Sequence, residues 1–380
     1  MNIPVLPILS LLSMTTVVLA CIFGVLMVLH SFLFLRNAIP LLRFRIRTNH
    51  KSSFPHFTVI VAAHNELENL QKLLPNLLSQ DYPSFDIIIA LDRTTDGSRE
   101  YLIKLKSENL KILDINTVPD SFHGKKYALT QAIAQAQNDW LLFTDADCMP
   151  ISNQWIQSFG SLTDETNDLI IGLSPYQSKP TFLSRLISYE TFQTAVSYFG
   201  AAMRGKPYMG VGRNMAYRKS AFMKVNGFGQ FQGILGGDDD LLVQQLVAQQ
   251  NFALNGSKES LTFSEPKKTW SDYLHQKTRH FSVGKYYLPR IKAALAFEAL
   301  IHSTLWLTFL YLLTTASHSV NYLSVFTVLI VLKGVIFHQI AVKFRMPLKI
   351  VWLPIVDLIF AVFLPLIGLK ASVEQNIRWK

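Results

Sequence analysis

Residues 140–147 read Trp-Leu-Leu-Phe-Thr-Asp-Ala-Asp, a short apolar run that ends in two carboxylates separated by one residue. Four consecutive apolar residues before a polar segment are typical of a strand that is buried on both faces. Carboxylates as close as Asp145 and Asp147 repel each other unless a cation lies between them, and their oxygens suit a hard divalent ion held with diphosphate oxygens. The stretch therefore predicts a strand of an α/β sheet with a metal site at its end.

Further apolar runs that predict strands precede this one in the sequence. Apolar runs at 57–62, 86–91 and 111–115 predict three more strands. The intervening segments have helical periodicity, at 67–78, 98–106 and 125–136. This alternation predicts a parallel sheet covered by helices, in which ligands bind beyond the carboxyl ends of the strands.

Polar residues follow three of these strands directly. His64 and Glu66 come after the first, Asp92 after the second, and the two aspartates after the fourth. Asp92 alone is better explained as a turn or cap residue. It is the convergence of carboxylates from three strand ends that predicts a site at this edge.

Both ends of the chain are apolar, in a sequence with 49% hydrophobic and only 16% charged residues. The stretch Val5–Leu35 contains no Lys, Arg, Asp or Glu. A stretch of this length is long enough to cross ~30 Å of hydrocarbon as a helix. It lacks the basic start of a signal peptide, so an uncleaved anchor is expected. Further apolar stretches lie at 293–315, 323–342 and 350–369. Asp357 and two prolines interrupt the last, which leaves a full span and a re-entrant hairpin both open.

The basic residues between these stretches predict which side the middle of the chain faces. Arg36, Arg43, Arg45, Arg47 and Lys51 follow the first stretch, and three basic residues occupy 343–349. The positive-inside rule therefore predicts a cytoplasmic middle domain. These residues also explain the net charge of +10, and no nucleic-acid motif accompanies it.

The predicted organisation has four parts: an anchor at 1–36, a cytoplasmic domain at 52–290, a membrane region with two or three spans at 291–370, and a basic tail at 371–380. Two segments have aromatic residues at helical spacing. Core packing and a membrane interface explain 182–199 equally well, whereas a membrane interface is favoured for 270–281 because basic residues accompany the aromatics. The two cysteines, Cys21 and Cys148, exclude a disulfide framework or a cysteine metal cluster.

The motifs after the strands, together with Gly-Lys-Lys-Tyr-Ala-Leu at 124–129, resemble those of family 2 inverting glycosyltransferases. The resemblance covers about 57–287. It implies the GT-A fold, a Rossmann-like α/β fold of nucleotide-diphospho-sugar transferases, with transmembrane helices on both sides. It also implies a divalent cation, with Mn²⁺ and Mg²⁺ both open.

The resemblance assigns roles by position. Those expected to bind the donor are Ala62, His64, Glu66, Asp92, Lys125 and Asp145, and those expected to hold the metal are Asp145 and Asp147. Those expected at the acceptor and diphosphate are Gly212, Arg213, Asn214, Gln276, Arg279 and His280. The catalytic base is expected at Asp239, with Asp238 second, because the triple aspartate 238–240 leaves the register open. Its aspartate neighbours are expected to raise its pKa.

The resulting hypothesis is transfer of a sugar, with inversion, from a nucleotide sugar to a lipid or lipid-linked acceptor. UDP is the expected nucleotide, and the expected location is the cytoplasmic face of a bacterial inner membrane. Two alternatives remain. One is a processive polysaccharide synthase. His280 disfavours it, because the family motif usually has Trp at this position and that Trp is typical of the acceptor channel in processive synthesis. The other is a non-catalytic scaffold or transport protein, for which Lys333 inside an apolar stretch is the argument.

Overall fold

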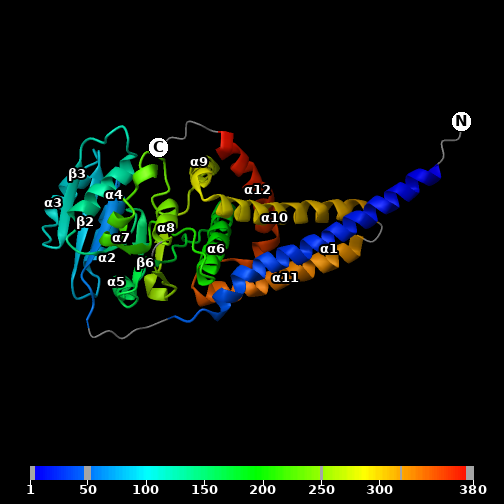
Figure 1. Ribbon diagram of the computed structural model, residues 1–380, viewed down its shortest axis with the longest axis horizontal. Helices are drawn as coiled ribbons and strands as arrows, with labels where there is room; N and C mark the ends of the chain where they lie inside the picture. Colours follow the sequence, from blue (N-terminus) through cyan, green and yellow to red (C-terminus); the bar gives the residue numbers. More distant parts are fainter. Residues whose placement is uncertain (1–4, 47–52, 249–250, 317–318, 374–380) are drawn as a thin grey trace.

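The computed structural model describes residues 5–46, 53–248, 251–316 and 319–373, with side chains from residue 14 onward. The sheet and its covering helices form one end of the molecule, and a bundle of long helices projects from it (Figure 1). The predicted tail at 371–380 lies outside the described residues from 374 onward, as do Arg47 and Lys51.

The main sheet has seven strands in the order β3-β2-β1-β4-β7-β6-β8. They are β1 (Phe57–Ala63), β2 (Phe85–Asp92), β3 (Leu110–Ile115), β4 (Trp140–Phe143), β6 (Asn167–Ile171), β7 (Met215–Arg218) and β8 (Asn251–Leu254). The four predicted strands are parallel, with Phe57 of β1 level with Phe85 and Trp140. The sheet is mixed beyond β4, because β7 runs antiparallel to both β4 and β6. A small second sheet pairs β5 (Cys148–Pro150) with β9 (Thr262–Ser264).

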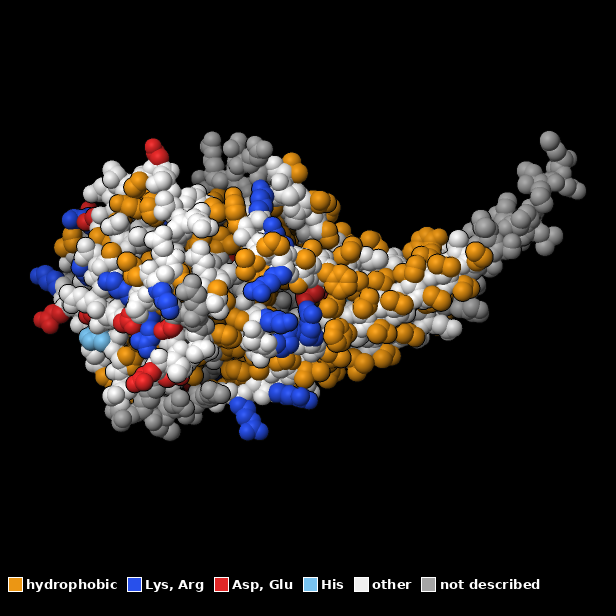
Figure 2. Space-filling view, in the orientation of Figure 1, with side chains coloured by type: hydrophobic (Ala, Val, Ile, Leu, Met, Phe, Trp, Pro, Cys, Tyr) orange, Lys and Arg blue, Asp and Glu red, His pale blue; other side chains and the backbone are white. Residues whose placement is uncertain are grey.

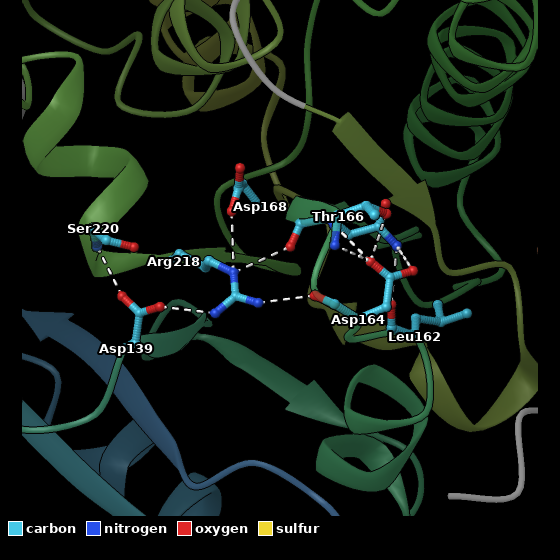
Figure 3. Close-up of polar contacts among 8 residues, drawn as sticks. Asp139, Leu162, Asp164, Thr166, Asp168, Arg218 and Ser220 are labelled. Atoms are coloured by element: carbon cyan, nitrogen blue, oxygen red, sulfur yellow. Dashed lines mark hydrogen bonds and ion pairs between the residues drawn. The ribbon is translucent and has the colours of Figure 1, made fainter.

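One arginine of the antiparallel strand β7 makes ion pairs and a hydrogen bond with residues near the neighbouring strands (Figure 3). Arg218 Nη1 lies 2.9 Å from Asp139 before β4, and its Nε lies 3.0 Å from Asp168 in β6. Its Nη2 donates to the Asp164 carbonyl at 2.8 Å. Because β7 starts far from β4 in sequence, these bonds help to fix the register of the antiparallel pairs.

Helices cover both faces of the sheet. On one face, α2 (Leu67–Leu78), α3 (Ser98–Lys104) and α5 (Trp155–Gly160) bury apolar side chains against the strands. The predicted stripe of α2 is confirmed, since Leu70, Leu74 and Leu77 are fully buried. On the other face lies α4 (Gly124–Gln135), and its core continues into the long helices. Two short helices, α7 (Lys219–Lys224) and α8 (Asp240–Leu246), complete this domain.

Among the described residues, four helices are long and apolar enough to cross a membrane by length and composition. They are α1 (Val5–Arg43), α10 (Pro289–Thr315), α11 (Ser319–Lys343) and α12 (Leu353–Val373), the last preceded by one 3-10 turn. Apolar side chains cover the projecting bundle, and Lys and Arg side chains gather where it meets the sheet domain (Figure 2). The last apolar stretch forms one continuous helix and not a hairpin. In Figure 1, α12 runs across the inner end of α10, against which it packs, instead of running alongside it.

Two further helices join the sheet domain to the bundle. In α6 (Phe182–Met203), Tyr189 and Phe192 are fully buried, and the helix packs against α1 and α12. Its aromatic stripe is therefore core. In α9 (Trp270–Val283), which packs against α12, Tyr273 is buried and Trp270 is exposed.

Candidate active site

A large cavity of about 1930 Å³ begins at the carboxyl edge of the sheet. All the site residues predicted from the sequence line it except Asn214. Their convergence follows from the topology, because β1, β2 and β4 are parallel neighbours and end on the same side.

Lys125 occupies the centre of this edge, at the start of α4. Its Nζ lies 2.9 Å from Asp145 Oδ1 and 2.9 Å from Asp238 Oδ2. Burial opposes the charged form of the lysine, but the two carboxylates together raise its pKa above the ordinary value. A fixed ammonium thus connects the aspartates after β4 with the triple aspartate before α8.

The triple aspartate follows two glycines whose backbone lies in the left-handed region, with φ of +79° at Gly236 and +75° at Gly237. A side chain is strained there, which explains the glycine pair. The turn places Asp239 at the N-cap of α8, where Oδ1 accepts from the Asp240 amide at 2.8 Å. Its Oδ2 accepts from the Gly212 amide at 3.0 Å.

The three aspartates differ in the direction in which their surroundings shift the pKa. Burial would raise the pKa of Asp238, but Lys125 lowers it below the ordinary value. Burial raises the pKa of Asp239, and the charge of Asp238 raises it further, as the sequence predicted. Burial and Asp239 raise the pKa of Asp240 well above its usual range, and Asp240 accepts a hydrogen bond from the Tyr287 hydroxyl. The site therefore places a carboxylate with a lowered pKa beside one with a raised pKa.

The ends of β1 and β2 form the other side of the cavity. Asp92 is buried, and Arg93 donates to both of its carboxylate oxygens, at 2.7 and 3.0 Å. His64 Nδ1 contacts the Asp92 carbonyl, and the amide of Asn69 donates to the carboxylate of Glu66. Sequence reasoning missed Arg93, since one arginine in a loop is no motif.

The aspartates after β4 fit a divalent cation. Ligand atoms of Asp145, Asp147 and Cys148 lie within 4.8 Å of one another. Cys148 is buried against the Ser264 hydroxyl, and burial raises the pKa of its thiol well above the ordinary value. The remaining donors are two carboxylates, one half-buried and one exposed, which is an oxygen set that Mn²⁺ or Mg²⁺ accepts.

In the loop before β7, one predicted site residue lines the cavity and its neighbour is buried in the protein core. Arg213 lines the cavity, donates to Ser174 Oγ and O at 2.7 Å, and lies over the Tyr176 ring. Asn214 is fully buried instead, where it donates to the carbonyls of Leu173 and Ser260 and accepts from the Trp155 indole. The structure thus places Asn214 in the scaffold that holds this loop.

Residues of α9 close the cavity opposite the sheet. Gln276 donates to the Tyr176 hydroxyl at 3.2 Å, and Arg279 and His280 also line the cavity. Burial lowers the pKa of Arg279, while Asp238 and Asp145 oppose that shift. This arginine therefore lies close to the carboxylates that Lys125 connects.

The far end of the cavity reaches the apolar helices. Leu300 and Leu307 of α10 line it, as do Leu366 and Leu369 of α12, and each of the four is more than half exposed on the outer surface. A lateral opening between α10 and α12 thus leads from the apolar exterior to the carboxylates. No pattern in the sequence indicates this opening, because it depends on how α12 crosses α10.

Part of the chain is similar in sequence to known glycosyltransferases. Residues 58–225 match the model for Glycosyl transferase family 2. The chain is 30% identical over 125 residues to "Glycosyltransferase AglE" of Haloferax volcanii, which is 32% of this chain and 40% of that protein. It is 34% identical over 90 residues to "Poly-beta-1,6-N-acetyl-D-glucosamine synthase" of Staphylococcus aureus strain COL, 24% of this chain and 21% of that protein. The chain thus spans less than half the length of either relative.

Among solved structures, the chain resembles a mannosyltransferase, PcManGT, from Pyrobaculum calidifontis, solved in complex with GDP-Man and Mn²⁺. The TM-score is 0.59 at 16% identity, and the match covers 96% of this chain and all of the other. This likeness extends over the apolar helices as well as the sheet domain, and it confirms the predicted GT-A fold.

Proposed function

We propose that this chain, which carries a glycosyltransferase family 2 domain, transfers a sugar from a nucleotide sugar to a lipid or lipid-linked acceptor, with inversion. One observation carries the proposal. A continuous cavity joins the carboxylates at the edge of the sheet to an opening between two apolar helices. A donor and a lipid can therefore reach the same carboxylates from opposite ends.

The donor is assigned to the end of the cavity beside β1 and β2. Ala62, His64, Glu66 and Asp92 would bind the nucleoside, and UDP remains the expected nucleotide from the resemblance. Lys125 is already held between two carboxylates, so it is placed to bind diphosphate oxygens without reorganisation. The mannosyltransferase of similar fold was solved with GDP-Man, and a guanine nucleotide therefore belongs in the same test.

Asp145 and Asp147 would hold the divalent cation. When bound, the cation would stabilise negative charge on the leaving diphosphate, an effect worth several kcal/mol. The chain itself supplies Lys125 and Arg279 for the same oxygens. Their fixed positions also keep the diphosphate close to the triple aspartate.

Asp239 is the proposed base. Its carboxylate is held by two backbone amides, and its raised pKa makes it a better proton acceptor than an ordinary aspartate. It would accept the proton of the acceptor hydroxyl while that oxygen attacks the sugar carbon and the diphosphate leaves. Asp238 is the weaker candidate, because Lys125 binds its carboxylate and lowers its pKa.

The four apolar helices support attachment to a membrane, with the domain at 52–290 on the side marked by basic residues. We propose the cytoplasmic face of a bacterial inner membrane as that side. Tagging both ends and testing protease access in sealed vesicles would check the orientation.

The deciding experiment uses the full chain purified in detergent. UDP- and GDP-sugars would be tested with a membrane lipid extract, with and without Mn²⁺ or Mg²⁺. We expect metal-dependent formation of a lipid-soluble product that Asp239→Asn abolishes, and the matched variant Asp81→Asn, at an exposed position outside the cavity, should retain it. A polymeric product would favour the processive alternative. Absence of any metal-dependent donor binding would favour a non-catalytic protein.

A further inference from the structure

The cavity contains a polar section between the triple aspartate and the apolar opening. We call it the acceptor chamber and define it by the residues that line it at the meeting point of α1, α6 and α10. They are Asn37, Gln193, Thr194, Ser197, Tyr208 and Glu298. None of these residues belongs to the set predicted from the family motifs.

Packing contacts bring these residues together. Ser197 Oγ and Tyr208 OH are 2.9 Å apart. Gly200 lies one helical turn beyond Ser197 and contacts the backbone of Asn37, where an added Cβ would meet Asn37 O at 2.5 Å. Gln193 and Ser197 are four residues apart and therefore share the face of α6 that α1 approaches.

The chamber lies next to the proposed base. Tyr208 lines the same cavity as Asp239 and Asp240. Burial raises the pKa of the Tyr208 hydroxyl, and the carboxylates of Glu298 and Asp240 act in the same direction. Asp240 directly follows Asp239 and accepts from Tyr287. A head group in the chamber therefore lies beside the carboxylate that would deprotonate it.

The chamber offers hydrogen-bond acceptors that lack donors. The side-chain oxygens of Asn37 and Gln193 are buried and have no hydrogen-bond partner among the described residues. Buried polar atoms without partners are costly, which indicates that a ligand or water completes them. Glu298 adds a carboxylate, which Arg36 binds.

The cations nearest the chamber are already paired with carboxylates, which leaves them less available to a phosphate group. Arg36 binds Glu298, and Lys277 of α9, which lines the same cavity, lies 2.6 Å from Glu190. In the described parts of α1, α6 and α12, no Lys or Arg lines the cavity. α10 contributes Lys292 in its first turn, and its ammonium donates to the Lys285 carbonyl. A phosphate has only acceptor oxygens and negative charge, whereas sugar hydroxyls can donate to amide oxygens and to a carboxylate.

We propose that the acceptor is a lipid whose head group already carries a sugar, and that the acceptor chamber binds the hydroxyls of that sugar. The inference rests on the proposed lipid acceptor and narrows its chemical class. A separate lipid glycosylation would then have to supply this substrate.

The test compares acceptors with the full chain in detergent, using whichever nucleotide sugar the protein turns over. The probes are a panel of monoglycosyl diacylglycerols, unglycosylated diacylglycerol and undecaprenyl phosphate. We expect kcat/KM for one glycosyl lipid to exceed the values for the other two classes by at least ~10-fold, because a site built around hydroxyls rejects a ligand that lacks them. Preference for undecaprenyl phosphate or diacylglycerol overturns the inference and leaves the proposed lipid transfer intact. Donor hydrolysis without any lipid product overturns both.

A variant pair tests the chamber itself. Gln193→Leu removes the amide at similar volume, and we expect it to raise KM for the glycosyl lipid by about tenfold, the effect of a lost hydrogen bond, without a matching change in KM for the donor. Ser188→Ala is the control, because Ser188 lies on the same helix and is also buried without a partner among the described residues, but lines a small separate cavity. Equal effects of Gln193→Leu on both KM values, or the same effect from Ser188→Ala, overturn the assignment. Thermal unfolding of both variants separates these results from a folding defect.

Discussion

A buried ion pair joins the apolar helices, and its removal is expected to destabilise the whole protein. Lys333 Nζ of α11 lies 2.6 Å from Asp357 Oδ1 of α12, and both residues are at most 2% exposed. Asp357 also accepts from the Trp306 indole at 3.1 Å and from the Tyr189 hydroxyl, and His302 Nε2 lies 3.2 Å from it. One carboxylate therefore connects α6, α10, α11 and α12.

The perturbation is Lys333→Met, which keeps the length of the side chain and removes its charge. Loss of one partner from a buried pair costs about 3–5 kcal/mol, because it leaves a charge without compensation. Asp357 keeps two neutral donors and His302, so we expect the lower end, about 3 kcal/mol. In a chain of this size, that loss should lower the melting temperature on the order of 5 °C.

The assay is thermal unfolding of the full chain in detergent, followed by tryptophan fluorescence. Lys72→Met, at an exposed position of α2, is the control for loss of a lysine. The double variant Lys333→Met/Asp357→Leu removes both charges and should recover most of the loss. The reasoning is refuted if Lys333→Met melts with the control, or if the double variant loses the sum of the two single changes.

Three further predictions concern the sheet domain. Burial and Asp238 raise the pKa of Asp239, so kcat/KM should fall as the pH drops through a pKa above that of an ordinary aspartate. Lys125→Met should move this acid limb of the kcat/KM profile to higher pH, because the charge of Lys125 lowers the pKa of Asp239. Asn214→Ala should cost about 1–3 kcal/mol of stability in thermal unfolding, because it removes buried hydrogen bonds, while nucleotide binding by the folded protein persists. Gly237→Ala should lower the melting temperature, because the φ angle is +75° and the added Cβ would lie 2.8 Å from a Leu241 carbon. A melting curve like that of the unchanged protein would contradict this prediction.

Local patterns in the sequence predicted the first half of the fold well. Strands β1 to β4 are short apolar runs followed by polar residues, and the amphipathic stripe of α2 identifies the helix between the first two. Parallel strands end on one side, so the prediction that Glu66, Asp92 and Asp145 share an edge followed from order along the chain. The cavity confirms that they converge.

The second half depended on contacts that no local pattern encodes. β7 is only four residues long, and its antiparallel position relies on the distant partners of Arg218. Asn214 stands inside a motif, yet its neighbours Trp155 and Ser260 make it part of the scaffold. In the sequence, Asp357 only interrupts an apolar stretch, because no local pattern shows that Lys333 lies beside it.

The apolar core connects the sheet domain to the long apolar helices. One continuous cluster of buried side chains runs from Ile60 and Ile88 on the sheet, through Phe192 of α6, to Phe23 of α1 and Leu305 of α10. A boundary near residue 290 would therefore cut through a packed interior and not through a linker. Because close-packed cores transmit displacement, the carboxylates and the opening between α10 and α12 are held at a fixed separation. Under the proposed function, a lipid acceptor would then present its head group at a fixed distance from Asp239, so the length of the head group would decide whether its hydroxyl reaches the proposed base.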